Sequence, residues 1–405
     1  MSSGLDLENQ YCAHNYHPLP VVLTRGEGVY LWDENDKKYL DMMSAYSAVS
    51  HGHSNPRVVE ALKQQAETLC IVSRAFYTDK LGAFLKLACD VTGQDMALPM
   101  NTGAEAVETA VKAARRWGYE SKGIETDKAE ILVCTGNFHG RTTTIISFSD
   151  EAEYQKNFGP LTPGFKVIDY GDADALEAAI TPNTAAFLVE PIQGEGGIII
   201  PPKGYLKRCK EICEANNVLL IADEIQCGLG RSGRMLACDH EDVKPDGLIL
   251  GKALGGGVMP VSMFLARQDV MDIFVPGTHG STFGGNPLAA AVGTAALNIL
   301  VEDQLADRSR DMGDYKLAEL NTLDSGLIQD IRGAGLFIGV EIDPAKGTAR
   351  EVCERLMDRG LLSKETHETV VRLAPPLIIT RDQIDWAITQ IREVLQEMDE
   401  VRLAS

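Results

Sequence analysis

The chain has 405 residues, with 38 Lys and Arg against 58 Asp and Glu, and a formal net charge of −20. Its 44% hydrophobic and 24% charged residues are ordinary for a folded globular protein and exclude a disordered or fibrous chain. The negative charge repels phosphate backbones and anionic membrane surfaces, so we expect neither nucleic acid nor a membrane as a partner. This length exceeds what one hydrophobic core serves, which predicts a large domain with a smaller one.

Cysteine usage and the first residues indicate the compartment. Residues 1–10 contain no basic segment followed by an apolar one, and no later run approaches the roughly 18 apolar residues of a membrane span. Nine cysteines are scattered without a disulfide framework, so we expect reduced thiols in a cytoplasmic protein. Cys209 and Cys213 share a helix face without a His or Cys pair nearby, which favours buried thiols over a metal site.

The predicted elements begin with a hairpin, in which residues 28–32 and 38–41 flank the polar residues 33–36. From about Leu85 to Arg267, short β-rich runs alternate with helical patterns, which is typical of an α/β fold whose mainly parallel sheet is covered by helices on both faces. Such a sheet places functional sites at the carboxyl ends of its strands. The expected strands are residues 131–134, 165–170, 185–190, 218–223, 248–250 and 261–266.

A mixed α+β segment follows and predicts the smaller domain. We expect residues 1–46 to belong to this small lobe, residues 47–294 to form the large domain and residues 295–405 to form the C-terminal small domain. No repeat and no Pro/Gly-rich linker marks these boundaries. The expected elements are one long helical stretch from Pro287 to about Leu320, the segment 331–341, a helix near residues 349–359, a strand at residues 370–373 and a final helix from Arg381.

Residues 101–105 (NTGAE) precede apolar residues at helical spacing, from Ala104 to Trp117. The first turn of such a helix, with Gly103 allowing close approach, can bind a phosphate through free backbone N–H groups. On its own this pattern is more often only a capped helix. Residues 280–287 (GSTFGGNP) offer hydroxyls and backbone amides before another helix, and alone they indicate no more than a turn.

Asp223 ends the apolar run 218–223, at the carboxyl end of a buried strand. An acid there needs a cationic or hydrogen-bonding partner to stay ionised, and a pyridine ring nitrogen is one such partner. A helix cap or a sheet-edge acid is the simpler alternative. Lys252 lies between the apolar strand 248–250 and three glycines, a setting that suits an amine that must be partly neutral to react. The combination of the two residues favours the functional interpretation.

Five motifs, in this order and approximate spacing, resemble the class III pyridoxal-phosphate-dependent aminotransferases. They are residues 101–105 (NTGAE), 190–195 (EPIQGE), 222–226 (ADEIQ), 251–252 (GK) and 280–287 (GSTFGGNP). Within this class the chain is most similar to the ornithine aminotransferases, through residues 14–20 (HNYHPLP), 44–49 (SAYSAV), 73–77 (SRAFY) and 372–376 (RLAPP). The resemblance implies the fold-type I architecture and pyridoxal 5′-phosphate as cofactor.

The resemblance also implies roles for the residues that contact the cofactor. Lys252 would bind it covalently and move a proton, and Asp223 would pair with its ring nitrogen. The remaining contacts fall to Phe138 on the ring face, Gln226 at the phenolic oxygen, Gly103 and Ala104 at the phosphate, and Thr282 at the phosphate of the other subunit. A homodimer with active sites at the subunit interface follows from that last contact.

Two substrates are implied, L-ornithine and 2-oxoglutarate. Arg141 and Arg372 would bind their carboxylates, and Glu195 would neutralise Arg372 while ornithine is bound. Tyr16 would bond the α-amino group of ornithine, and Tyr46 would line the same pocket. The chain departs from its relatives at His139, where many have Trp, and at Ala104, where a larger residue is frequent.

Other activities remain open at this point. Acetylornithine, 4-aminobutyrate or another ω-amino acid could be the donor, because all these reactions use the same cofactor residues. A racemase or decarboxylase on the same fold, or a binding protein without catalysis, is less consistent with a switchable Glu195 and Arg372 pair and with the presence of both Asp223 and Lys252.

Overall fold

The computed structural model of this chain describes residues 4–404. Its centre is a seven-stranded sheet, in which β10 is antiparallel to both of its neighbours and the other pairs are parallel. The expected α/β fold with a mainly parallel sheet is therefore confirmed. In spatial order the strands are β4 (Met96–Met100), β10 (Ser262–Ala266), β9 (Gly247–Leu250), β8 (Leu219–Asp223), β7 (Thr184–Val189), β5 (Glu130–Cys134) and β6 (Phe165–Ile168).

The edge strand β4 was not among the strands expected from the sequence. Its five residues, MALPM, include Pro99, and a proline inside a short run argues against a strand in the middle of a sheet. At the edge the proline is tolerated, because one side of the strand has no hydrogen-bonding neighbour.

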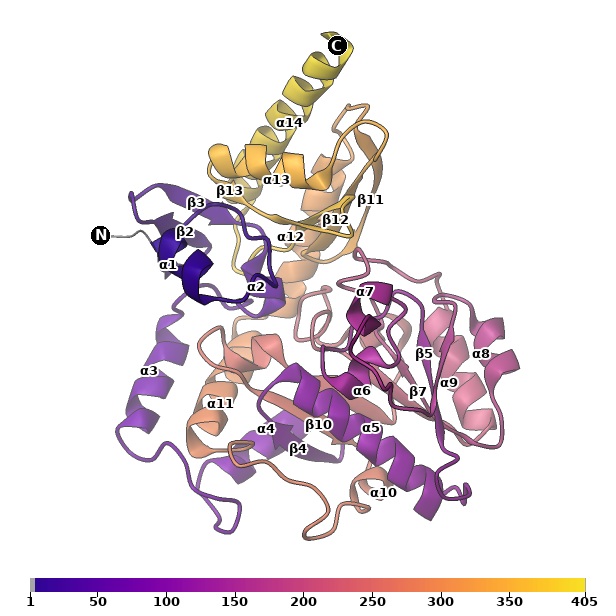
Figure 1. The fold of residues 1–405 in the computed structure, drawn as a ribbon. Coiled ribbons are helices and arrows are strands. Elements are labelled where there is room, and N and C mark those ends of the chain that lie inside the picture. Colours follow the sequence, from indigo (N-terminus) through magenta and orange to yellow (C-terminus); the bar gives the residue numbers. More distant parts are fainter. Residues whose placement is uncertain (1–3, 405) are drawn as a thin grey trace.

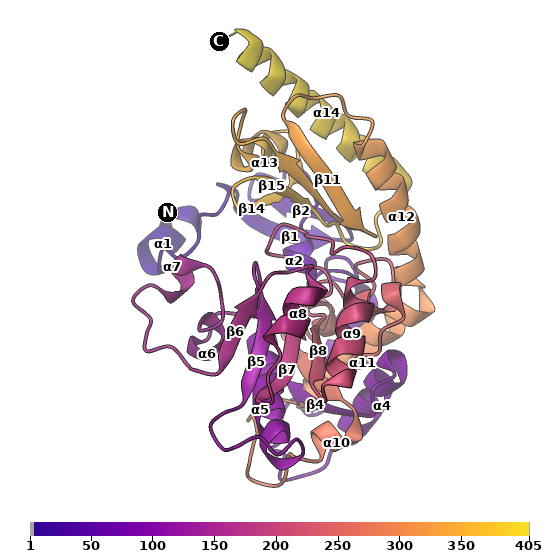
Figure 2. The same ribbon diagram turned by 90° about the vertical axis from the view of Figure 1, so that its right-hand side faces the viewer.

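Different helices cover the two faces of this sheet, as the alternation of side chains along a strand requires. In β8, Leu219 and Ile221 pack in one cluster with α5 (Gly103–Glu120), whereas Leu220 and Ala222 pack in another with α9 (Tyr205–Ala215). Figures 1 and 2 show these helices on opposite sides of the sheet. Burial of both faces explains why the strand is a continuous apolar run in the sequence.

Two smaller sheets lie at one end of the molecule, and segments from both ends of the chain form them (Figure 1). The expected hairpin is present, and its second strand pairs in parallel with a strand from the last fifty residues, with Leu361 opposite Leu40. The exact boundaries expected between the large and the small domain, at residues 46 and 294, stay a prediction. One sheet has the order β1 (Leu23–Glu27), β2 (Tyr30–Asp33), β3 (Lys38–Asp41), β13 (Leu361–Leu362), and the other β11 (Ile328–Ala334), β12 (Phe337–Ile342), β15 (Val370–Leu373), β14 (Lys364–Thr366).

One expectation was wrong: residues 287–320 do not form one continuous helical stretch. They form α11 (Pro287–Glu302) and α12 (Leu305–Leu320), which are bent by 58° relative to each other. Gln304 has a left-handed backbone with a φ of 50°, and this conformation ends the α-helical hydrogen-bond ladder. Within residues 4–404 no single helix has the length and apolarity of a membrane span, and only this bent pair, taken together, meets that criterion.

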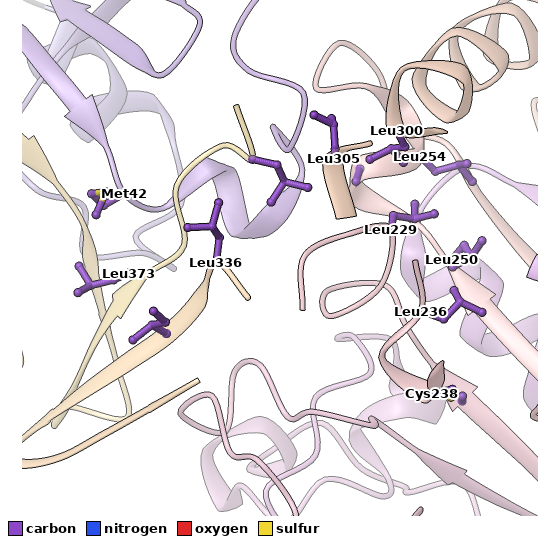
Figure 3. Close-up of a cluster of buried hydrophobic side chains, with 14 of the residues drawn as sticks. Met42, Leu229, Leu236, Cys238, Leu250, Leu254, Leu300, Leu305, Leu336 and Leu373 are labelled. Atoms are coloured by element: carbon purple, nitrogen blue, oxygen red, sulfur yellow. The ribbon is translucent and has the colours of Figure 1, made fainter. Parts of the chain in front are cut away.

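The remaining helices surround the three sheets. They are α1 (Gly4–Tyr11), α2 (Ser44–Ser47), α3 (Pro56–Ala66), α4 (Leu81–Thr92), α6 (Thr143–Ile146), α7 (Ala152–Gln155), α8 (Ala173–Ala179), α10 (Gln268–Met271), α13 (Ala349–Asp358) and α14 (Arg381–Ala404). One large buried cluster connects the parts of the molecule: Figure 3 shows Leu250 and Leu300 on the side of the large sheet, Leu305 beside them, and Leu336 and Leu373 on the side of the smaller sheets.

The close approach of α12 to the turn between β11 and β12 gives a stability prediction. A Cβ at Gly313 would lie 2.1 Å from the carbonyl of Gly335, a backbone group that cannot move aside alone. We expect Gly313→Ala to lower the free energy of unfolding by about 2–3 kcal/mol, which is within the usual range for overpacking a filled site. The measurement is the midpoint of thermal unfolding, which should be lower in the variant. Gly82→Ala in α4 is the matched control, because a Cβ there meets nothing within 4 Å. An equal effect of both changes would contradict the packing explanation.

Candidate active site

Asp223 and Lys252 lie at the same edge of the large sheet because their strands are parallel neighbours. Asp223 is the last residue of β8 and is paired in register with Ile249 of β9, and Lys252 follows the end of β9 by two residues. Every residue of both strands is buried. The structure therefore brings together the two residues that the sequence singled out, at the carboxyl ends of adjacent strands.

Lys252 is held in a setting that disfavours its charged form. Its backbone is left-handed, with a φ of 43°, and its Nζ lies 5.7 Å from the centre of the Tyr46 ring. Burial lowers the pKa of Lys252 to about 8, although the carboxylate of Glu195 acts in the opposite direction. With this pKa about one-tenth of the amine is neutral at pH 7, far more than for an ordinary lysine, and the neutral amine is the nucleophile.

Asp223 is buried and forms a direct pair with His139, a contact that the sequence did not predict. Its Oδ2 lies 2.7 Å from His139 Nδ1, and its Oδ1 accepts the backbone N–H of Ile225 at 3.1 Å. Burial alone would lower the pKa of His139, but the hydrogen bond to Asp223 and its charge outweigh burial and raise it. Among the described residues His139 Nε2 has no hydrogen-bond partner.

The N-terminus of α5 lies beside this edge of the sheet. Thr102 caps the helix in a reciprocal capping box with Glu105. The first-turn amides of Gly103 and Ala104 have no acceptor within a helix, so they can bind an anion. A Cβ on Gly103 would lie 2.9 Å from the side chain of Ile225, which explains the glycine by close packing against the end of β8.

Arg372 is nearly completely buried on β15 and joins a cluster of three polar side chains. Its guanidinium lies 3.1 Å from Glu195 Oε1 and donates to Gln226 Oε1 at 2.8 Å. Gln226 Nε2 in turn donates to the same Glu195 oxygen at 3.1 Å. Burial alone would raise the pKa of Glu195, but the charges of Arg372 and Lys252 outweigh it and lower the pKa. The expected Glu195 and Arg372 pair is thus formed directly, and Gln226 connects to both.

Arg141 packs against two aromatic rings. Its guanidinium carbon is 3.7 Å from the centre of the Tyr154 ring and 5.5 Å from that of Phe138. The sequence did not single out Tyr154. Glu190 is a second residue that the sequence missed: it is buried, accepts the N–H groups of Phe138 and Gly194, and has its pKa raised to about 7 by burial. Its position in the EPIQGE motif was the available signal.

Tyr16 and Tyr46 both line a cavity of about 560 Å³ between the N-terminal segment and the small sheets. Asp223 and Lys252 do not line it. The Tyr46 side chain is half-buried and comes within 5.1 Å of the Arg372 guanidinium, so it lies between the cavity and the buried cluster. Tyr16 is largely exposed, at 73%. The Thr282 side chain is also exposed, and the neighbouring Ser281 accepts a hydrogen bond from Asn101 just before α5.

This geometry accommodates pyridoxal phosphate. A buried carboxylate is available for a pyridinium nitrogen, because an Asp has room for more than the two bonds seen here. A helix N-terminus with unpaired amides is available for a phosphate, and an amine of lowered pKa is available for the aldehyde. No group of three His, Cys, Asp or Glu side chains in residues 4–404 is arranged to hold a metal ion.

Comparison with known proteins gives one consistent family. The ornithine aminotransferase of Geobacillus sp. (strain WCH70) is 58% identical over 388 residues, covering 96% of this chain and 97% of the relative. Ornithine aminotransferase 2 of Staphylococcus aureus (strain Mu50) is 58% identical over 97% of this chain and 98% of its own length.

Solved structures of aminotransferases have the same fold as this chain. The ornithine aminotransferase of Toxoplasma gondii superposes with a TM-score of 0.97 at 46% identity, covering 99% of this chain and 97% of that one. The acetylornithine aminotransferase of Elizabethkingia anophelis superposes with a TM-score of 0.88 at 48% identity, covering 97% and 98%. The class-III aminotransferase family model matches residues 11–395. Hence the chain belongs to the class-III aminotransferases and is a pyridoxal-phosphate-dependent enzyme.

Proposed function

We propose that this enzyme transfers the δ-amino group of L-ornithine to 2-oxoglutarate, giving L-glutamate 5-semialdehyde and L-glutamate. The proposal rests on the relatives named ornithine aminotransferases, which are 58% identical over nearly the full length of the chain. The Glu195 and Arg372 pair supports it, because two chemically unlike substrates must use one site in turn.

The cofactor residues follow from the chemistry of the groups present. Pyridoxal phosphate, when bound, supplies a ring that withdraws electrons from the reacting carbon and holds the amino group between the two substrates. Asp223, oriented by His139, would keep the ring nitrogen protonated. Lys252 would hold the cofactor and then move a proton at the reacting carbon of the substrate. The other contacts are proposed for Gly103 and Ala104 at the phosphate, Phe138 at the ring face, Gln226 at the phenolic oxygen and Thr282 of the partner subunit at the phosphate.

The two arginines would bind the substrates in different ways. Glutamate and 2-oxoglutarate have a carboxylate beside the reacting carbon, and Arg372 would bind it as a bidentate fork. The δ-carbon of ornithine has none, so Arg372 would stay paired with Glu195 and its buried charge would remain compensated. Arg141 would bind the carboxylate at the far end of either substrate. Tyr16 would bond the α-amino group of ornithine beside Tyr46.

The assembly and the compartment are also proposals. The exposed Thr282 and the exposed aromatic residues Phe76, Tyr77 and Phe283 favour a homodimer with active sites at the subunit interface, since large exposed apolar side chains mark contact surfaces. All nine cysteines are free thiols, which favours the cytoplasm.

Acetylornithine aminotransferase is the second candidate, because a solved enzyme of that name is 48% identical to this chain. N-acetylornithine has no free α-amino group, so the two activities make different demands on Tyr16. Another ω-amino donor, such as 4-aminobutyrate, would need no partner for an α-amino group at all.

A donor panel tests the proposed function. With 2-oxoglutarate as acceptor, we expect the enzyme to prefer ornithine over N-acetylornithine and 4-aminobutyrate, with glutamate formed in equal amount to the trapped semialdehyde. Tyr16→Phe should lower kcat/KM for ornithine about tenfold or more, the effect of losing one hydrogen bond to a charged group, and leave 4-aminobutyrate unchanged.

The control for this substitution is Tyr11→Phe, a nearby exposed tyrosine that does not line the cavity. Unchanged relative rates for ornithine and 4-aminobutyrate in Tyr16→Phe would remove the main structural support for ornithine. A preference for N-acetylornithine in the unmodified enzyme would establish the second candidate instead.

Glu195→Gln tests the alternation between the two substrates. Without the carboxylate, Arg372 is a buried cation with no counter-charge unless a substrate carboxylate binds it. We expect the half-reaction with ornithine to slow by about tenfold or more and the half-reaction with glutamate to be preserved. Single-turnover measurements on the holoenzyme separate the two. Equal slowing of both half-reactions would show that Glu195 is not a switch.

The pKa of Lys252 predicts the pH dependence of cofactor capture. Only the neutral amine reacts, so the capture rate of the apoprotein should rise with pH below about 8 and level off above it. An ordinary lysine, with a pKa near 10.4, would continue to gain rate up to about pH 10. Borohydride trapping and mass spectrometry of the Lys252 peptide measure this rate, with a free lysine amide as the reference. A continued rise above pH 9 would contradict the lowered pKa.

A further inference from the structure

Side chains from four separate parts of the chain donate hydrogen bonds to the backbone carbonyls of the segment that begins at Arg372. Four consecutive carbonyls, of residues 372–375, each accept a hydrogen bond from a different buried side chain. The pairs are Ser363 Oγ to the Arg372 carbonyl, Lys316 Nζ to that of Leu373 at 2.7 Å, Ser44 Oγ to that of Ala374 at 2.7 Å and Arg231 Nη1 to that of Pro375 at 2.6 Å.

This segment needs such donors because it leaves the sheet in the interior of the protein. The strand β15 ends at Leu373, and the next residues include Pro375 and Pro376, which have no N–H group for a regular ladder. Residues 370–376 are all buried, so carbonyls without a donor would be costly. Side-chain donors replace the ladder at the end of the strand that contains Arg372.

Lys316 is the least expected of these donors. Its side chain is completely buried on α12, in a stripe of helix positions that faces the core with Leu305 and Leu320. Its ammonium group donates to the carbonyl of Leu373, and no carboxylate among the described residues forms an ion pair with it. Burial lowers the pKa of Lys316 well below its usual range, and the nearby Arg231 acts in the same direction. An apolar side chain would fill this position at less cost.

Two further positions of the same buried stripe on α12 contact the surroundings of this segment. Ser309 Oγ donates to the carbonyl of Arg231 at 2.9 Å and accepts the N–H of Leu336 at 3.0 Å. Gly313 lets the turn at Gly335 approach the helix directly. Lys316 continues this row by one more turn and meets the peptide that follows Arg372. The row therefore connects α12 to the turn before β12 and to the end of β15.

The bonds of the Arg372 guanidinium explain why its backbone must be held. Its side-chain partners are Glu195, Gln226 and, at 3.4 Å, the carbonyl of Gly194. On the proposed function Glu195 leaves Arg372 when a dicarboxylate binds. The position of the guanidinium then depends more on its backbone, and a misplacement of about 1 Å is enough to lower rates markedly.

We propose that Lys316 is a positioning residue for Arg372, and that its bond to the Leu373 carbonyl matters mainly for the half-reaction with glutamate and 2-oxoglutarate. The inference rests on the proposed function, in which ornithine reacts without contacting Arg372. A residue that only stabilised the fold would affect both half-reactions alike, so the difference between them is the readout.

Lys316→Met tests this role, because methionine keeps most of the side-chain volume and removes the donor. The two half-reactions are followed separately on the holoenzyme by the absorbance of its cofactor. We expect the concentration of 2-oxoglutarate or glutamate that gives half-maximal rate to rise about tenfold, and the half-reaction with ornithine to stay within about twofold. Lys122→Met is the matched control, since Lys122 Nζ also donates to backbone carbonyls, those of Thr184 at 2.7 Å and Asn216 at 3.1 Å, away from Arg372.

Equal loss in both half-reactions, or no loss in either, would overturn the proposal. If Lys316→Met does not fold, Ser363→Ala gives the same test, because it removes the donor at the carbonyl of Arg372 itself and changes little volume. If the unmodified enzyme does not use ornithine, the proposed function fails. The role of Lys316 is then still tested by comparing glutamate with 4-aminobutyrate, whose reacting carbon also has no adjacent carboxylate.

Discussion

Strands β8 and β9 run in parallel through the middle of the large sheet, with Asp223 opposite Ile249, and this register determines where the charged groups of the site can lie. Both strands are buried on both faces, so polar side chains are admitted only where the strands end. The N-terminus of α5 reaches the same edge, where Gly103 packs against Ile225. A carboxylate, an amine and a set of free amides meet there because two strands end and one helix begins at the same edge of the sheet.

The site places several ionisable groups in a region of low solvent exposure, and two direct pairs form among them. His139 compensates Asp223, and Glu195 compensates Arg372. Lys252 lies within the influence of both Glu195 and Arg372, so its lowered pKa reflects burial modified by two opposing charges. Removal of one member of such a pair leaves the charge of the other uncompensated in the interior. A substitution at these residues therefore changes both the activity and the stability of the protein.

Backbone strain is concentrated in the turn at residues 44–47, next to the active site. Ser44, Ala45, Tyr46 and Ser47 all have positive φ angles between 44° and 73°, and none of them is a glycine. Asp41 accepts the N–H groups of Met43 and Ser44, and Ser44 is bonded to the segment after Arg372. The turn that presents Tyr46 and the strand end that presents Arg372 therefore hold each other, although they are more than 300 residues apart in the chain.

The sequence by itself was sufficient for the α/β class, most strands of the large sheet, the hairpin at residues 28–41 and the location of Asp223 and Lys252 at the carboxyl ends of buried strands. These features depend on local periodicity and on apolar runs, which a single chain displays directly. Only the tertiary structure decided the contact of His139 with Asp223, the break at Gln304 and the bond of Lys316 to Leu373. Each depends on how segments distant in the chain pack, or on one backbone conformation that packing imposes. A buried lysine on the apolar side of α12 gives no local sign of the carbonyl that it meets.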